Sequence, residues 1–335
     1  MYQVPHPNLV SNVHRDCVQM PSRELGFIGL GVMGYPMALN LLKKLDNGGK
    51  LHVYDVSDEV LRRFEHEAPH LVSICSSSRE VMERSDILFT IVPEGSHVRT
   101  VYLDDKNGVL SGTIEDKVFV DCSTIDTGTS IEINDAVNKK CSTARFYDAP
   151  VSGGSLGAAS GTLTFMLGCR EDDPKLPILN DLLGAMGSSI FPCGGLSLGL
   201  TAKLCNNYCS GLIAIATAEA LNIGIKSGIN PILLSKIFTT STAQSTINDK
   251  WNPVPGVCPD APASKDYQGG FKVQLMKKDF NLAVETAKRV GAQLRLGESG
   301  LAVYQEASED DRCRDRDSRV VFRYIGGDEH WEQSE

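Results

Sequence analysis

The stretch SLGLTAKLCNNYCSGLIAIATAEALNIGIKSG, from Ser197 to Gly228, decides how the rest of the chain is organised. It contains no proline, and its internal glycines weaken a helix without preventing one. Apolar residues occupy every face of the predicted helix, a pattern typical of a helix buried on several sides. Lys203 and Asn207 lie one turn apart near its start and share a face. On this stretch alone, the simplest interpretation of Lys203 is a surface lysine whose stem lies along a core helix. The alternative is an active-site lysine that faces a cavity.

Before this stretch, short apolar runs alternate with helical patterns, which predicts a parallel sheet covered on both faces. After Gly195 the strand signals fade and helical patterns dominate. Residues 251–270 have no regular pattern and contain four prolines, which favours an ordered lid or rim. The predicted strands are 25–30, 51–55, 71–75, 86–93, 117–121, 145–148, 163–168 and 189–192, and the predicted helices are 33–45, 58–66, 97–103, 130–140, 173–186, 198–228, 231–241, 271–290, 297–308 and 315–325.

Composition excludes several functional classes. The chain has 335 residues, 41% of them hydrophobic and 22% charged, as in ordinary soluble globular proteins. Its net charge of -9 argues against broad binding to nucleic acid or to an acidic membrane. The ten cysteines and seven histidines form no C-x-x-C or H-E-x-x-H pattern, so no metal is predicted. The most apolar stretch, 204–225, contains polar residues that argue against a transmembrane span.

A glycine loop near the N-terminus predicts a dinucleotide site. The sequence Gly29-Leu30-Gly31-Val32-Met33-Gly34 fits G-x-G-x-x-G between a predicted strand and a predicted helix. Glycines there permit a tight turn and close approach of a pyrophosphate to the helix N-terminus. Asp55 follows 21 residues later, where a carboxylate accepts hydrogen bonds from the ribose hydroxyls of NAD and repels the 2′-phosphate of NADP. Arg62 and Arg63 lie a turn into the next helix, so NADP is disfavoured and not excluded.

A second glycine-rich segment follows the predicted strand 145–148. Ser152, Gly153 and Gly154 continue into a stretch that also contains Gly157 and Gly161. Backbone N–H groups of such a loop, with the Ser152 hydroxyl, can bind a carboxylate. The alternative is a flexible connection, and we predict the anion site.

Several motifs in order resemble the 3-hydroxyisobutyrate dehydrogenases within the β-hydroxyacid dehydrogenase family. The resemblance runs from about residue 25 to about residue 302. It implies an α/β Rossmann-type domain followed by an all-α domain, joined by a long interdomain helix. It also implies NAD-dependent oxidation of (S)-3-hydroxyisobutyrate to methylmalonate semialdehyde, a step of valine catabolism. The motifs are GFIGLGVMGYPMALNL, IVP, DCSTID, DAPVSGG, GTLTFMLG, GLTAKLCNN, WNPVPGV, DYQGGF and LMKKDFNLA.

The resemblance assigns roles to individual residues. Lys203 matches the catalytic lysine, Asn207 matches the amide that holds the substrate, and Lys278 matches a lysine that reaches the cofactor from the helical domain. Without the resemblance, Lys278 would be predicted to lie on a solvated helix face. His97 stands where members commonly carry asparagine. The substrate carboxylate is assigned to Ser152, Gly153 and Gly154, and the cofactor to Gly29, Leu30, Gly31, Val32, Met33, Gly34, Asp55, Val92, Pro93, His97 and Thr124.

The resemblance also implies a domain organisation and partners. We predict a tail over 1–22, an NAD-binding domain over 23–194, a helical domain over 195–326 and a tail over 327–335. The small-molecule hydroxy acid is the expected partner, together with further copies of the chain in a homodimer or homotetramer. Relatives suggest a mitochondrial location, while the N-terminus is a poor transit peptide, so a cytoplasmic location stays open. The charged run 306–319 is expected to be a solvated face that departs from the family.

Two other functions stay open. The first is a sister enzyme that reduces glyoxylate, succinate semialdehyde or tartronate semialdehyde, since the sequence does not identify the side chains that contact C2 of the substrate. The second is a non-catalytic NAD-binding scaffold. That alternative would be expected to lack Lys203 or the Ser152–Gly154 loop, and both are present.

Overall fold

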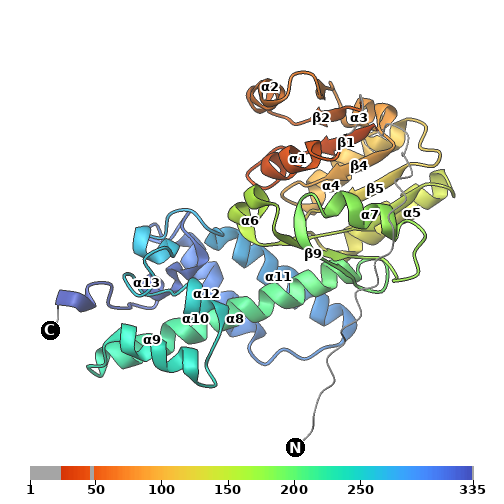
Figure 1. The fold of residues 1–335 in the computed structure, drawn as a ribbon. Helices are drawn as coiled ribbons and strands as arrows, with labels where there is room; N and C mark the ends of the chain where they lie inside the picture. Colours follow the sequence, from red (N-terminus) through yellow and green to blue (C-terminus); the bar gives the residue numbers. More distant parts are fainter. Residues whose placement is uncertain (1–23, 46–48, 334–335) are drawn as a thin grey trace, which may run out of the picture.

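A computed structural model describes residues 24–45 and 49–333, so the predicted tail 1–22 lies outside the described residues. An α/β half and a helical half lie side by side, and α8 begins in the first and extends through the second (Figure 1). The strands are β1 Leu25–Ile28, β2 Leu51–Tyr54, β3 Val72–Ile74, β4 Ile87–Thr90, β5 Val118–Asp121, β6 Arg145–Asp148, β7 Val151–Ser152, β8 Leu163–Leu167 and β9 Gly187–Pro192. The α-helices are α1 Gly34–Leu42, α2 Asp58–Glu67, α3 Ser78–Arg84, α4 Gly95–Leu103, α5 Thr127–Lys140, α6 Gly154–Ser160, α7 Leu176–Leu183, α8 Leu198–Lys226, α9 Pro231–Thr240, α10 Thr246–Lys250, α11 Val273–Val290, α12 Gly297–Glu309 and α13 Val321–Tyr324, with short 3₁₀ turns η1 Val109–Ser111, η2 Pro262–Lys265, η3 Ser318–Val320 and η4 Trp331–Gln333.

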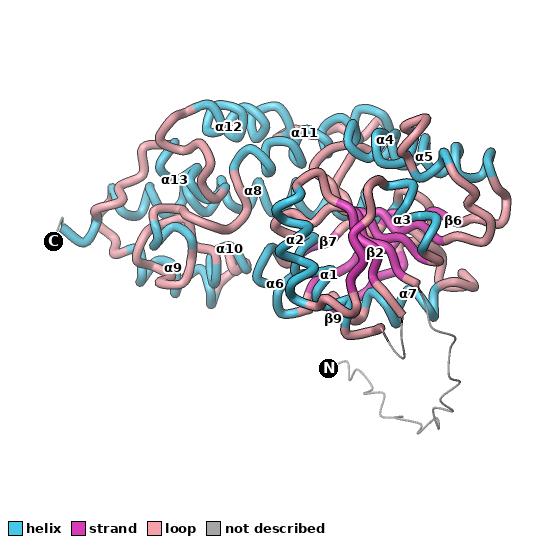
Figure 2. The backbone as a smooth tube through the Cα atoms, turned by 90° about the horizontal axis from the view of Figure 1, so that it is seen from above, coloured by secondary structure: helices cyan, strands magenta, loops and turns pink. Residues whose placement is uncertain are grey.

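The main sheet has six parallel strands in the order β3-β2-β1-β4-β5-β6. Strands β1, β4 and β5 are buried along their whole length because helices cover both faces (Figure 2). The strand order reverses between β1 and β4, and ligands of such sheets bind at the carboxyl ends of the strands at this point. The predicted Rossmann-type fold is therefore confirmed, and it places the loops after β1 and β4 at the expected cofactor crevice.

A small mixed sheet, β7-β8-β9, follows the main sheet. The glycine-rich segment predicted as a loop after Gly153 is instead the helix α6, which packs beside α1. Asn40 of α1 holds it through a hydrogen bond of 2.7 Å from Nδ2 to the carbonyl of Ala158. Helices α3 and α10 also form where no helix was predicted. The short polar sequences of these helices give little periodic signal.

Helix α8 is the long helix predicted from its sequence. It packs against α11, α13 and β8, and Gly211 lets Phe280 and Tyr304 approach, since a Cβ there would lie 3.1 and 3.2 Å from their rings. Its length and mean hydropathy of 1.4 would suit a membrane-spanning helix, and 33% of its most apolar window is buried. The expectation of burial on several sides is thus only partly met, because Cys205, Cys209 and Ile223 are exposed.

The C-terminal region differs from the sequence-based expectation. The run 306–319 was predicted to be solvated, but Asp317 is fully buried and lies 2.9 Å from the guanidinium of Arg319, which is itself buried. Residues 251–270 are ordered, as expected, since Tyr267 is fully buried and its hydroxyl donates to the Pro253 carbonyl. Their role as a lid or rim stays a prediction. In the predicted tail 327–335, Trp331 packs against the helical core. We retain a division of the chain near residues 194 and 195 as a proposal.

Candidate active site

The glycine turn joins β1 to α1 at the carboxyl edge of the sheet. Gly29 has φ +94°, and a Cβ there would lie 2.1 Å from the Ile91 carbonyl oxygen. A Cβ on Gly34 would lie 1.9 Å from the Gly29 carbonyl oxygen. A Cβ on Gly31 would meet no described atom within 4 Å, so this glycine faces open space. No side chain caps the N-terminus of α1. The Tyr35 N–H donates to the Gly31 carbonyl at 3.0 Å and Pro36 has no N–H, so the N–H groups left for an anion are those of the turn up to Gly34. The turn therefore fits a dinucleotide pyrophosphate.

Asp55 follows β2 and lies beside this turn. One carboxylate oxygen accepts from the Leu30 N–H at 2.7 Å, and the other accepts from the Ser57 N–H at 2.9 Å. Each oxygen keeps a further lone pair. These bonds fix the carboxylate next to the glycine turn, where it can accept from ribose hydroxyls. Val32, in the turn, is 80% exposed.

The loops after β4 and β5 complete the crevice. Val92 donates its N–H to the Ser123 hydroxyl at 2.9 Å, which ties the two loops together. Lys278 of α11 reaches both loops, and its Nζ donates to the carbonyls of Pro93 at 3.0 Å and Thr124 at 2.7 Å. The solvated helix face expected from local sequence is therefore wrong for Lys278. His97 lies exposed in α4.

Lys203 and Asn207 lie on the buried face of α8, with 7% and 6% of their surface exposed. The simple interpretation of Lys203 as a surface lysine is therefore wrong. No described residue makes a hydrogen bond or ion pair with its amine. Burial lowers the pKa of Lys203 from its ordinary value, Asp279 raises it and Lys278 lowers it further. A buried amine with a lowered pKa and no partner suits proton transfer.

Asp279 is a site residue that the sequence did not single out. It is 2% exposed, and its Oδ2 accepts from Asn207 Nδ2 at 2.7 Å. Its Oδ1 lies 3.3 Å from Lys278 Nζ and has no hydrogen-bond partner among the described residues. The only signal was its place in the motif LMKKDFNLA, directly after Lys278. Asp279, on α11 beside Lys278, thus joins this helix to Asn207 of α8 through a hydrogen bond.

The predicted carboxylate loop lies on the side of the sheet that faces the helical half (Figure 1). Ser152 ends β7, and Gly153 and Gly154 have φ of +131° and +64°, which favour glycine. Both glycines are exposed, and a Cβ on Gly154 would meet nothing within 4 Å. The turn therefore has free space around its backbone, as an anion-binding turn requires.

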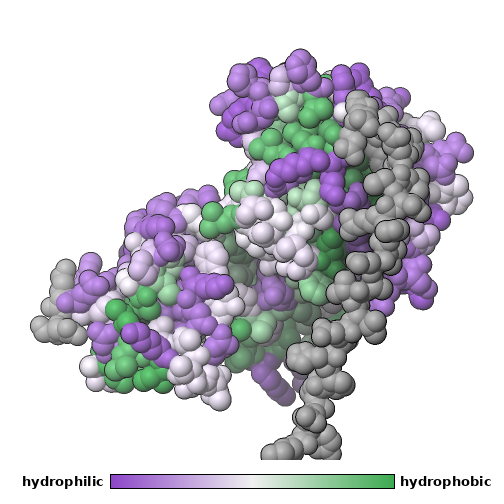
Figure 3. All heavy atoms as spheres, viewed as in Figure 1, coloured by the Kyte–Doolittle hydropathy of each residue, from purple (hydrophilic) through white to green (hydrophobic). Residues whose placement is uncertain are grey.

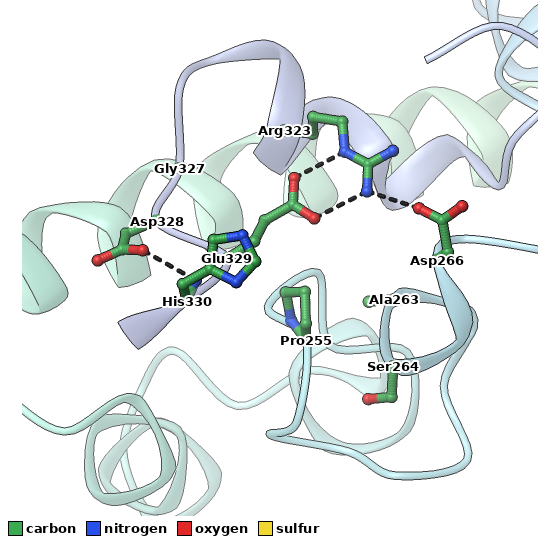
Figure 4. A pocket seen from close by; sticks show the side chains of 9 residues that line it. All are labelled: Pro255, Ala263, Ser264, Asp266, Arg323, Gly327, Asp328, Glu329 and His330. Carbon is green, nitrogen blue, oxygen red and sulfur yellow. Dashed lines mark hydrogen bonds and ion pairs between the residues drawn. The ribbon is translucent and has the colours of Figure 1, made fainter. Parts of the chain in front are cut away.

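A cavity of about 600 Å³ lies elsewhere, near the C-terminus (Figure 4). Arg323 points into it and is paired with Glu329 at 2.7 Å and with Asp266 at 2.7 Å. None of the residues predicted for the site lines this cavity. The cavity is therefore separate from the candidate active site.

Comparisons with known proteins identify the family. Residues 24–195 match a family model described as the NAD binding domain of 6-phosphogluconate dehydrogenase, and residues 198–325 match the NAD-binding domain of NADP-dependent 3-hydroxyisobutyrate dehydrogenase. The second match extends past residue 302, so the prediction that the charged C-terminal run departs from the family is wrong.

Individual relatives agree. The probable mitochondrial 3-hydroxyisobutyrate dehydrogenase of Dictyostelium discoideum is 41% identical, over 84% of this chain and 85% of that protein. The NAD-dependent L-serine dehydrogenase of Pseudomonas aeruginosa is 37% identical, over 84% and 91%. The solved 3-hydroxyisobutyrate dehydrogenase of Mycobacterium tuberculosis with L-serine has a TM-score of 0.82 and 32% identity, over 91% and 99%. The chain therefore belongs to the 3-hydroxyisobutyrate dehydrogenases of the β-hydroxyacid dehydrogenase family, and it is a dehydrogenase with a nicotinamide cofactor, consistent with NAD.

Proposed function

We propose that this enzyme oxidises (S)-3-hydroxyisobutyrate to methylmalonate semialdehyde with NAD, in valine catabolism, and that Lys203 is the general base. The observation that carries the proposal is the buried, unpaired amine of Lys203 beside Asn207. The turn Ser152–Gly154 holds the substrate carboxylate in this proposal, and Asn207 orients the substrate. NAD held by the Gly29–Gly34 turn and Asp55 would supply the hydride acceptor for C3.

Proton transfer depends on the state of Lys203. In oxidation its neutral amine accepts the proton of the C3 hydroxyl, and in reduction its ammonium donates a proton to the carbonyl oxygen. Burial favours the neutral amine because a charged group is poorly solvated there. Asp279 works against this effect and stabilises the ammonium form. The two effects on the pKa of Lys203 therefore oppose each other, and burial is the larger.

The direct test is NADH formation by the purified protein with (S)-3-hydroxyisobutyrate. We expect turnover with NAD to exceed turnover with NADP, because Asp55 would repel a 2′-phosphate. Glyoxylate, succinate semialdehyde and tartronate semialdehyde, assayed with NADH, serve as comparison substrates. A higher kcat/KM with one of these semialdehydes would overturn the substrate assignment.

L-Serine is a second candidate substrate. It shares the carboxylate and the C3 hydroxyl, and it differs by an ammonium group at C2. The L-serine dehydrogenase relative and the solved relative with L-serine favour it. The ratio of kcat/KM for the two substrates decides between them.

Replacing Asp279 with asparagine should shift the pH dependence of turnover. The carboxylate raises the pKa of Lys203, so its removal lowers that pKa further. Oxidation needs the neutral amine, and its rate should therefore begin to fall at a lower pH than in the wild type. The measurement is kcat for oxidation from pH 6 to 10 in both proteins. An unchanged acid limb, or a limb moved to higher pH, would contradict the proposed contact between the charges.

We also propose that the enzyme is a homodimer or homotetramer assembled through an apolar surface on α8 and α9. Apolar side chains gather over α9 in Figure 3, and Leu233 is 55% exposed. The surface consists of Ile223, Ile229, Ile232, Leu233 and Ile237. Together these five residues expose an area on the order of 400 Å², about half of what each subunit contributes to a stable dimer.

Sedimentation velocity tests this surface with a second copy as its occupant. We expect the wild type to sediment as a dimer or tetramer at micromolar concentration, and Leu233→Glu to shift it toward monomer. Leu296→Glu is the matched control, since Leu296 is 57% exposed outside this surface. A monomeric wild type would overturn the proposal.

The name of the Dictyostelium relative supports a mitochondrial location, which we propose for this chain. Import of a fluorescent protein fused to the C-terminus of the full chain tests it. Uniform cytoplasmic fluorescence would contradict it.

A further inference from the structure

Asp148, at the end of β6, is a fully buried carboxylate with no ion-pair partner among the described residues. Its two oxygens accept from backbone N–H groups at the start of α8. Oδ1 accepts from Ser197 at 2.7 Å, and Oδ2 accepts from Leu200 at 2.8 Å. No side chain of the helix's own N-cap residue caps α8, and Ser197 has a left-handed φ of +63°. Asp148 thus supplies the capping bonds that the local sequence lacks.

The surrounding chain leaves little space for the carboxylate to move. A Cβ on Gly168 would lie 1.9 Å from Asp148 Oδ1. A Cβ on Gly199 would lie 2.9 Å from Asp148 Oδ2 and 2.1 Å from the Met166 carbonyl oxygen. The backbone carbonyl of Asp148 also accepts from the Gly168 N–H at 2.7 Å. Two glycines therefore let the helix start and β8 close around this side chain.

The position of Asp148 joins two parts of the proposed site. Four residues after it, the chain reaches Ser152, the first residue of the proposed carboxylate turn. Three residues after Leu200, whose N–H it binds, α8 presents Lys203, and Asn207 follows one turn later. The same residue is thus covalently close to the turn and hydrogen-bonded to the helix that carries the proposed base.

We propose that Asp148 is a positioning residue for the dehydrogenation, whose ionised carboxylate holds the first turn of α8, and with it Lys203, in place relative to the Ser152–Gly154 turn. The inference rests on the proposed roles of Lys203 and of this turn. In this proposal Asp148 acts by setting the position of Lys203 and not by its charge on the substrate. A displacement of a reacting group by about 1 Å can cost about 100-fold in rate, so such positioning has a large effect.

Because the carboxylate of Asp148 titrates, its proposed effect on the position of α8 should depend on pH. Burial raises the pKa of Asp148 to about 6, while its backbone hydrogen bonds lower it. The titratable groups that face it are Asp121 of β5, Cys169 after β8 and Cys193 after β9, and none is a cation. Below this pH one oxygen carries a proton and accepts more weakly from the helix N–H groups. Since the folded-state pKa is raised, ionisation also lowers stability as the pH rises from about 4 to about 6.

Asp148→Asn tests the proposal, because the amide resembles the protonated acid and turns an N–H donor toward the helix. The reaction is reduction of methylmalonate semialdehyde by NADH from pH 5 to 9, a direction in which Lys203 stays protonated at low pH. In the wild type we expect kcat to fall as the pH drops below about 6. In the variant we expect kcat at pH 7.5 to be at least about tenfold lower, with no further fall below pH 6 and unchanged NADH affinity.

Ser77→Ala is the matched control, since it removes the side-chain cap of α3, away from α8. It should lower the Tm and leave kcat and its pH profile unchanged. An Asp148→Asn variant that keeps the wild-type kcat, or that keeps the wild-type acid limb, would overturn the inference.

Amide hydrogen exchange separates this inference from the proposed function. We expect faster exchange at Ser197–Leu204 in Asp148→Asn, and no change in α11. Wild-type protein that turns over no tested substrate would refute the proposed function, whereas an active wild type with unchanged exchange in the variant would refute the anchor alone.

Discussion

Lys203→Met is expected to lower kcat for hydroxy acid oxidation by about 10²–10⁴-fold, the usual contribution of general acid–base catalysis. Methionine keeps the length of the side chain and its packing at a position that is 7% exposed, and it removes only the proton acceptor. The cofactor crevice is formed by loops after β1, β2, β4 and β5, so NAD affinity should stay within about twofold. Steady-state kinetics and NADH fluorescence titration measure the two quantities.

The control for this experiment is Lys277→Met, at the residue before Lys278 in α11. Lys277 is half-buried and has no ion-pair partner among the described residues. It should retain most of the wild-type turnover. Full activity of Lys203→Met would remove lysine from the mechanism and leave the proton acceptor to be found elsewhere.

The second large effect concerns two glycines of the same turn, whose replacement should weaken NAD binding in both cases but lower stability in only one. Gly34→Ala places a Cβ 1.9 Å from the Gly29 carbonyl oxygen, which is backbone and cannot rotate away. We expect destabilisation at the upper end of about 1–3 kcal/mol, or more, with loss of NAD binding. Gly31→Ala meets nothing within 4 Å, so its stability should be close to that of the wild type. Its NAD affinity should still fall at least about tenfold, because the new methyl group stands where the pyrophosphate must approach.

Urea unfolding and NADH titration of both variants check this pair of predictions. Unchanged NAD affinity in Gly31→Ala would mean that the cofactor does not approach this face of the turn. An equally stable Gly34→Ala would show that the β1–α1 turn relaxes more readily than its contacts indicate.

Local sequence was sufficient for the nucleotide-binding turn because each of its signals is local. The strand, the glycines and the following helix lie within about 20 residues, and Asp55 directly follows the next strand. The tight turn requires glycine at Gly29 and Gly34, where a Cβ would clash with a backbone carbonyl oxygen. The same reasoning failed at α6, where glycines at both ends of a real helix resemble a loop.

Local sequence did not predict the contacts between the α/β half and the helical half. Lys278 and Asp279 look like ordinary charges on an exposed helix, and only the fold brings them to the loops after β4 and β5 and to Asn207. Lys203 posed the same problem, since a lysine on an apolar helix has two interpretations until its neighbours are known. The burial of Asp317 likewise depends on pairing with Arg319, which the density of charge alone did not reveal.

The anchoring of α8 to β6 has a consequence for recombining enzymes of this kind. By its hydrogen bonds, the start of α8 belongs to the nucleotide-binding half, although a division of the chain at residues 194 and 195 assigns it to the other. A chimera joined at that boundary takes Lys203 from one parent and Asp148 from the other. A crossover placed after Asn207 takes both residues from the same parent, so the helical half is exchanged without separating Lys203 from the carboxylate that binds the start of its helix.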